Sequence, residues 1–255
     1  MATKNTGSKA AREAAQAARA QARAEQKTRE RKIQLVGGIA VAVIVVVLVT
    51  IGVTTAKKTA GGVDPSAAKP KGVSSDSYGI QVGKAWTAPN ADSIPKLELW
   101  EDFQCPACKG LEDASGRAIS ALANSGKLRL EYRPTIFLDA NLAAQNAANK
   151  NPESSLEATM GLGCAADQGK AMEYHAAVFA NQPSEGVGYN SNELRFYAQL
   201  AGLKGKSLDN FTDCLANRTY EGWAKNSYAK FNSEGITSTP TGILNGKTVD
   251  NKVLY

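Results

Sequence analysis

The sequence predicts an α/β domain with an inserted helical subdomain, preceded by one transmembrane helix. An apolar-rich run, Lys96 to Phe103, is followed by helical spacing after Cys105 and then by the strictly alternating run Lys127 to Arg133, which gives the order strand, helix, strand. Helical spacing then continues over residues 141–233, too long for a simple crossover connection. Leu35 to Ala56 is free of charge and about the length that crosses a bilayer core.

In chain order the sequence divides into four parts. Residues 1–32 form a basic cytoplasmic tail, 33–56 a transmembrane helix, 57–77 a flexible linker, and 78–255 the folded domain with a helical insert at about 140–233. Because positive charge stays on the cytoplasmic side, we expect a single-pass protein of the cell membrane, anchored in the lipid bilayer, with an extracytoplasmic domain. The alternative is a cleaved signal peptide, whose apolar region is normally only about 7 to 15 residues.

The net charge of +6 belongs to the N-terminal tail. Residues 1–32 hold nine Lys or Arg and three Glu, and the rest of the chain has 21 basic and 21 acidic side chains. The folded part therefore has no general attraction for anionic polymers, and no nucleic-acid partner is predicted.

Within the folded domain, a short strand is expected in Tyr78–Ala85, and Gly126 is placed to cap the helix that follows Cys105. Asn245-Gly246 between two short β-prone runs predicts a closing hairpin. Five helices are expected in the insert, at Ser154–Ala166, Gly169–Ala180, Ser191–Ala201, Leu208–Ala216 and Tyr220–Asn232.

Cys105 and Cys108 are the chemical centre of the sequence. Pro106 suits the first helical position, which puts Cys105 at the N-cap and Cys108 one turn inside the helix. Free N–H groups and the positive end of the helix dipole then favour the Cys105 thiolate, which predicts a redox pair. Half of a zinc site and an inert disulfide are the alternatives; the chain offers only two distant cysteines and one histidine, His175, to complete a zinc site, so no metal is expected.

Three segments together resemble a known family. They are W-E-D-F-Q-C-P-A-C-K around Cys105, M-E-Y-H-A-A-V-F-A-N-Q-P in the helical region, and T-S-T-P-T-G-I-L-N-G-K near the end. In this order they are similar to the DsbA-like thiol:disulfide oxidoreductases of the thioredoxin superfamily, in particular to membrane-anchored bacterial members, over residues 79–249. The resemblance implies a thioredoxin-like fold with a helical insert.

The same resemblance implies roles for individual residues. Cys105 would be the exposed nucleophile and Cys108 the buried resolving thiol. Pro240 would be a cis-proline facing them, and Thr239 would offer its backbone to an extended substrate; an ordinary trans turn is the alternative. The partners implied are unfolded exported proteins with cysteines and a quinone-linked membrane reoxidase, and no cofactor is implied.

The sequence departs from this family at three places. Strongly oxidising members carry His between the cysteines, where this chain has Ala107 after Pro106, which predicts a less oxidising pair. Many relatives have a buried Glu six residues before the first cysteine; here that residue is Leu99, so Glu101, Asp102 or solvent would have to handle protons at Cys108. The family's closing helix is missing after the hairpin, so either the sequence is truncated or one face of the sheet is less well covered.

Other residues are expected to be structural. Cys164 and Cys214, on two helices of the insert, are expected to form a disulfide, with two separate buried thiols as the alternative. His175 lies on the inward stripe of a helix and is expected to be a packed core histidine. Trp100 is expected in the core, near enough to the cysteines to shield them.

The sequence thus favours an extracytoplasmic enzyme that forms disulfides in exported proteins through Cys105 and Cys108. Ala107 and the missing acid leave open a reductase or isomerase of the same fold. A membrane-tethered peptide-binding module, in which Cys105 and Cys108 form only a structural disulfide, is the alternative from another class.

Overall fold

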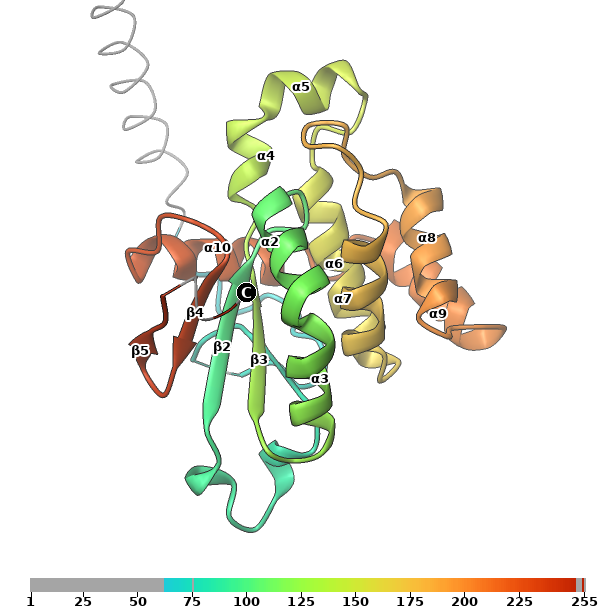
Figure 1. Ribbon diagram of the computed structural model, residues 1–255. Helices are drawn as coiled ribbons and strands as arrows, with labels where there is room; N and C mark the ends of the chain where they lie inside the picture. The colour runs from blue at the N-terminus through green and yellow to red at the C-terminus, as the bar shows by residue number, and fades with distance from the viewer. Residues whose placement is uncertain (1–61, 75, 251–253, 255) are drawn as a thin grey trace, which may run out of the picture. The chain divides into compact units, whose positions relative to one another are not determined.

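The structure is a computed structural model that describes residues 62–74, 76–250 and 254 (Figure 1). The predicted basic tail and transmembrane helix lie outside these residues. Within the part that is described, no helix is both long and apolar enough to cross a bilayer. The chain separates into the units Met1–Ala60 and Gly61–Tyr255, and the fold below is that of the second.

The second unit is built on a five-stranded mixed sheet with the order β1-β3-β2-β4-β5. The central pair, β2 and β3, is parallel, and every other neighbouring pair is antiparallel. Two single-turn 3-10 helices, Ala85–Thr87 and Ala91–Ser93, connect β1 to β2. The strands are β1 (Ile80–Val82), β2 (Lys96–Glu101), β3 (Arg129–Pro134), β4 (Thr241–Leu244) and β5 (Lys247–Thr248).

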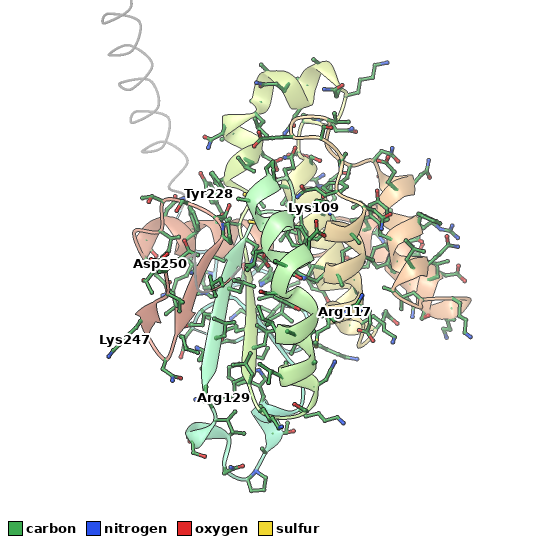
Figure 2. All side chains as sticks on the ribbon, viewed as in Figure 1. Lys109, Arg117, Arg129, Tyr228, Lys247 and Asp250 are labelled. Atoms are coloured by element: carbon green, nitrogen blue, oxygen red, sulfur yellow. A yellow bond between two sulfur atoms is a disulfide. The ribbon has the colours of Figure 1, made fainter. Side chains whose placement is uncertain are left out.

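The helix after β2 has three sections, α2 (Pro106–Leu111), a π-helical turn at Glu112–Gly116, and α3 (Arg117–Asn124). It was predicted as one regular helix, and the π turn has no signature in the apolar spacing. Gly126 follows it with a φ of 74°, the left-handed conformation that ends many helices. Figure 2 shows Lys109 and Arg117 on the outer side of this helix, away from the sheet.

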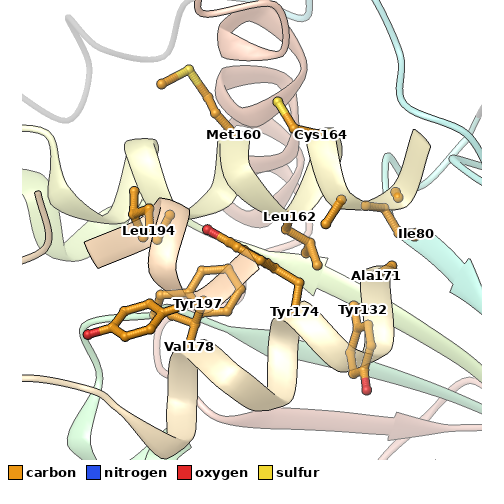
Figure 3. Close-up of a cluster of buried hydrophobic side chains, with 14 of the residues drawn as sticks. Ile80, Tyr132, Met160, Leu162, Cys164, Ala171, Tyr174, Val178, Leu194 and Tyr197 are labelled. Atoms are coloured by element: carbon orange, nitrogen blue, oxygen red, sulfur yellow. The ribbon is translucent and has the colours of Figure 1, made fainter. Parts of the chain in front are cut away.

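Seven helices make up the insert, two more than the five expected. The five expected helices are all present and have a shared apolar core, part of which Figure 3 shows. A disulfide joins Cys164 on α6 to Cys214 on α9, the pair expected from the sequence. The helices are α4 (Phe137–Asn141), α5 (Ala143–Ala148), α6 (Ser154–Asp167), α7 (Ala171–Ala180), α8 (Ser191–Leu200), α9 (Lys206–Ala216) and α10 (Glu221–Ser233).

Alternate residues of β2 face opposite layers of the domain. Leu99 packs with Leu111 of α2 and with Leu254 near the end of the chain, so Leu254 helps to cover this face of the sheet. Trp100 points the other way, where its ring meets the edge of Phe231 on α10 at 5.4 Å between centroids. Figure 1 accordingly shows α2 and α3 in front of the sheet and α10 behind it.

The folded unit begins earlier than residue 78, because part of the segment expected to be a linker is bound to the insert. The side chain of Asn226 on α10 accepts a hydrogen bond from the backbone N–H of Asp64 at 2.8 Å and donates one to its carbonyl oxygen at 2.7 Å. The backbone N–H of Lys71 donates to Asp167 of α6 at 3.0 Å. The Gly, Pro and Ser composition of this segment gave no sign of these partners, which come from helices about 100 to 160 residues away.

Candidate active site

Cys105 and Cys108 lie where β2 ends and α2 begins. Cys105 is the N-cap residue, with extended backbone angles (φ −76°, ψ 117°), and Pro106 is the first helical residue. Both cysteines are free thiols. The Cys105 residue is 7% exposed and Cys108 is fully buried, so only the first sulfur can be approached from outside.

The two thiols have opposite electrostatic environments. A hydrogen bond from the Cys108 thiol and the backbone N–H groups of Ala107 and Cys108 lower the pKa of Cys105 to about 6, although burial opposes them. Burial raises the pKa of Cys108 well above its usual value, and the hydrogen bond to Cys105 raises it further. At neutral pH the site therefore holds a thiolate at Cys105 and a thiol at Cys108.

The loop before β4 lies against this pair. The peptide bond between Thr239 and Pro240 is cis, and the Cys105 sulfur lies 3.4 Å from the carbonyl oxygen of Thr239. This contact joins residues that are 134 positions apart in the chain. Cys105 was expected to be an exposed nucleophile, and this contact covers part of it.

The helical insert holds the active-site backbone in place through two side chains. Gln182, just after α7, donates hydrogen bonds to the carbonyl oxygens of Phe103 and Cys105 at 2.8 and 3.0 Å. The Tyr189 hydroxyl donates to the same Phe103 carbonyl at 2.6 Å. Neither residue was predicted from the sequence to support the site, although Gln182 belongs to the N-Q-P segment of the resemblance.

Glu101 is the acidic group that is coupled to the cysteines. Burial raises its pKa well above the usual value, and negative charge on Cys105 raises it further. Glu101 in turn contributes to the raised pKa of Cys108. A buried acid that is coupled to the cysteines therefore lies at position 101, two residues after Leu99 and on the same face of β2.

Asp102 has a different environment. Its carboxylate accepts hydrogen bonds from the Ser155 hydroxyl at 2.6 Å and from the backbone N–H groups of Gln104 and Leu138 at 2.9 and 3.1 Å. These contacts tie the residues just before Cys105 to α4 and α6. Asp102 is thus placed to fix the loop, whereas Glu101 is the buried carboxyl group that interacts electrostatically with the cysteines.

Two other expectations can be compared with the geometry. Trp100 lies on the α10 side of β2 beneath Arg133, whose guanidinium is 4.1 Å from the ring centroid, and its ring contacts are made there rather than with the cysteines. Among the described residues, the one group of three side chains able to hold a metal ion contains Glu101, Glu112 and His175 and neither of the two cysteines. No group of three such ligands in residues 62–74, 76–250 and 254 therefore includes Cys105 or Cys108.

Comparison with known proteins agrees with this arrangement. The sequence profile of the family described as Thioredoxin matches residues 87–255. The chain belongs to the thioredoxin family. Its α/β sheet with a helical insert is the thioredoxin-like fold expected from the sequence. Comparison with curated protein sequences found no match.

Several solved structures resemble this thioredoxin-family chain. The reduced form of the disulfide bond oxidoreductase DsbG from Mycobacterium tuberculosis is 26% identical, with a TM-score of 0.55 over 69% of this chain and 80% of that one. Oxidised DsbA from the same organism is also 26% identical, with a TM-score of 0.55 and coverages of 68% and 85%. The thiol-disulfide oxidoreductase MdbA from Actinomyces oris has the same fold, with 20% identity, a TM-score of 0.58 and coverages of 77% and 89%. The prediction of a DsbA-like thiol:disulfide oxidoreductase is thereby confirmed.

Proposed function

We propose that this oxidoreductase acts outside the cytoplasmic membrane and forms disulfides in exported proteins through Cys105 and Cys108. The observation that carries the proposal is the asymmetry of the two sulfurs. Cys105 is the more accessible and has a lowered pKa, while Cys108 is fully buried and has a raised pKa. Such a pair favours attack on one sulfur and release of the other.

The oxidation proceeds in two thiol–disulfide exchanges. A substrate thiolate attacks the Cys105 sulfur of the Cys105–Cys108 disulfide, the S–S bond breaks, and Cys108 leaves and takes up a proton. A second substrate thiolate then attacks the substrate sulfur of the mixed disulfide, and Cys105 leaves as a thiolate. The substrate gains a disulfide and loses two electrons, and these two electrons reduce the Cys105–Cys108 pair. Because the Cys105 thiolate is stabilised, it is a good leaving group in the second exchange.

The location and the partners belong to the proposal. The uncharged residues 35–56 and the basic residues before them support a single-pass anchor with the catalytic domain outside. There, unfolded exported proteins would deliver thiols to Cys105. A quinone-linked membrane protein would reoxidise the reduced pair, as the family resemblance implies.

A reductase of the same fold is the second candidate, and one observation favours it. The pKa of Cys105 is lowered to about 6, closer to the value of about 7 for thioredoxin than to about 3.5 for DsbA. Ala107 stands where a histidine would further stabilise the thiolate. A less stabilised thiolate makes the disulfide a weaker oxidant.

Trapping of mixed disulfides tests the proposed function. Full-length Cys108→Ala protein, with no second thiol to release the substrate, should accumulate a covalent complex with a reduced, unfolded protein under mild oxidation. The matched Cys105→Ala variant should form none, because its remaining sulfur is fully buried. Equal trapping by both variants, or by neither, would overturn the proposal. A glutathione titration of the wild type then gives the direction, since a potential near about −120 mV favours oxidation and one near about −270 mV favours reduction.

A further inference from the structure

Three buried titratable side chains have no part in the exchange steps described above, and one of them, Glu101, is electrostatically coupled to both cysteines. Glu101 of β2, Glu112 of the π turn and His175 of α7 each offer one oxygen or nitrogen atom, and these three atoms lie within 4.8 Å of one another. The Nε2 atom of His175 is 2.9 Å from Glu101 Oε2, and its Nδ1 atom is 3.8 Å from Glu112 Oε2. The imidazole therefore stands between two carboxyl groups, with one ring nitrogen facing each.

The surrounding residues hold the imidazole in this orientation. Its ring stacks on Tyr132 of β3 with 3.8 Å between centroids and an angle of 13° between planes. Phe103 and Phe179 meet it edge-on at 5.6 and 4.9 Å. A ring packed on three sides keeps each nitrogen directed at its own carboxyl group.

The π turn places the outer carboxyl group. Glu112 is the first residue of this turn, and a π turn in an α-helix is frequent at functional sites. A side chain at Gly116, one turn later, would collide with the Glu112 carboxylate, so glycine leaves the space that this group occupies. Glu112 is thus turned inward towards His175 although the turn lies on the outer helix.

The cluster reaches from the cysteines to the surface. At its inner end, Glu101 is electrostatically coupled to both Cys105 and Cys108. At its outer end, Glu112 lines a groove of 590 Å³ between the α3 and α7 helices, which lie side by side in Figure 1. The Glu112 side chain is 8% exposed, whereas those of His175 and Glu101 are 3% and 4% exposed, so exposure increases only at the groove.

We propose that Glu101, His175 and Glu112 form a proton relay between Cys108 and the α3–α7 groove. This inference rests on the proposed role of Cys108 as the buried resolving thiol. When the Cys105–Cys108 disulfide is reduced, Cys108 leaves as a thiolate and needs one proton where no solvent reaches it. Glu101 gives this proton to Cys108 and is reprotonated from His175 Nε2. Nδ1, which has no hydrogen-bond partner among the described residues and lies 3.8 Å from Glu112 Oε2, takes a proton from Glu112 when the two groups approach to hydrogen-bond distance, and Glu112 takes up a proton from solvent in the groove.

Reoxidation of the pair reverses each transfer. Cys108 loses its proton to Glu101 as its sulfur attacks, and one proton leaves Glu112 for solvent in the groove. Cys108 is uncharged both in the disulfide and as a thiol, and Glu101, His175 and Glu112 return to their starting charges after each exchange. The relay therefore serves exchange in either direction and does not depend on whether oxidation or reduction is the physiological reaction.

The pKa values of the relay suit this transfer. Burial, with a contribution from Glu101, raises the pKa of Glu112 to about 7, so this group both gains and loses protons at neutral pH. Burial lowers the pKa of His175 and raises that of Glu101, which keeps the interior of the relay uncharged at rest. The titratable groups of neighbouring elements that interact electrostatically with the cluster are Cys105, Cys108, Asp113 and Tyr132, and the charged Arg117 and Glu173 line the groove outside it.

A metal ion fits this geometry less well. One ligand atom of each of the three side chains lies within 4.8 Å of the others, so the three could reach one cation. However, each ring nitrogen of His175 is nearer to a different carboxyl group, Nε2 to Glu101 at 2.9 Å and Nδ1 to Glu112 at 3.8 Å, instead of one nitrogen facing both. This arrangement suits proton transfer, because an imidazole that accepts a proton at one nitrogen can donate a proton from the other.

The variant Glu112→Gln in the full-length protein tests the relay. It keeps the size and polarity of the side chain but cannot carry a proton. The rate to measure is that of reduction of the Cys105–Cys108 disulfide by a small dithiol, sampled by rapid quenching at several pH values. We expect the variant to be slower than the wild type by at least about tenfold at pH 7. The dependence of this rate on a group of pKa about 7 should disappear, and small diffusible acids such as imidazolium buffer should partly restore the rate. The pH midpoint for alkylation of Cys105 should stay near its wild-type value.

Glu173→Gln is the matched control. Glu173 lines the same groove from α7, but its side chain is 48% exposed and pairs with Lys170, so the control should match the wild type. If Glu112→Gln exchanges as fast as the wild type at every pH, or if the control is slowed equally, the relay is wrong. If the wild type itself does not exchange disulfides, the proposed function fails instead, and the two outcomes are therefore distinguishable.

Discussion

The side-chain amide of Gln182 donates a hydrogen bond to the backbone carbonyl oxygen of Cys105 at 3.0 Å. The same carbonyl accepts from the backbone N–H of Lys109 and so begins α2. Gln182 thus links the end of α7, in the insert, to the first turn of the catalytic helix. The insert is part of the support of the active site as well as a cover for the sheet.

The variant Gln182→Ala should lower the free energy of unfolding by about 1 to 2 kcal/mol, because it removes two partly buried hydrogen bonds to backbone carbonyl groups. Denaturant unfolding followed by circular dichroism measures this. The neighbouring variant Asn181→Ala removes one exposed hydrogen bond to its own helix and should change stability by less than about 0.5 kcal/mol. Equal losses in the two variants would show that Gln182 has no special role.

Removing the disulfide of the insert should destabilise the protein without affecting the redox pair. The bond between Cys164 and Cys214 closes a loop of 50 residues, which is worth roughly 4 kcal/mol in the chain-entropy model. The double variant Cys164→Ala/Cys214→Ala should lose about this much in denaturant unfolding. The double variant Cys105→Ala/Cys108→Ala, which keeps the structural bond, is the control. A loss below about 1 kcal/mol would mean that helix packing alone holds α6 to α9.

Stability should fall as the pH rises from about 4 to about 7. Burial raises the pKa of both Asp102 and Glu112 to about 7, above the value of about 4 in an unfolded chain. The folded protein therefore binds more protons than the unfolded chain in this window, and each such group lowers the free energy of unfolding by up to about 1.4 kcal/mol per pH unit as the pH rises. Denaturant unfolding at pH 5 and pH 7 at constant ionic strength checks the sign. Glu112→Gln should flatten the slope, and a protein more stable at pH 7 than at pH 5 would contradict the expectation.

Local signals in the sequence were sufficient for most of the fold. The strands, the five long helices and the Asn245-Gly246 hairpin follow from periodicity and turn chemistry, which act over a few residues. The position of Cys105 at the helix N-cap follows in the same way from Pro106. These features could be predicted because each depends on neighbours in the chain.

The parts that could not be predicted depend on residues far apart in the sequence. Gln182 reaches Cys105 across 77 positions, and Asn226 reaches Asp64 across 162. The π turn that directs Glu112 inward has no apolar period of its own. His175 was predicted to be a packed core histidine, and it is buried, but only the fold shows that its two nitrogens face two carboxyl groups.

The ionisation of Cys105 tests the account most directly. A pH series of alkylation on the reduced full-length protein, with the modified cysteine identified by mass spectrometry, measures its pKa. We expect Cys105 to be modified with a midpoint near pH 6 and Cys108 to stay unmodified in the folded protein at neutral pH. A midpoint near that of an ordinary thiol, about 8.5, or faster modification of Cys108, would contradict the account.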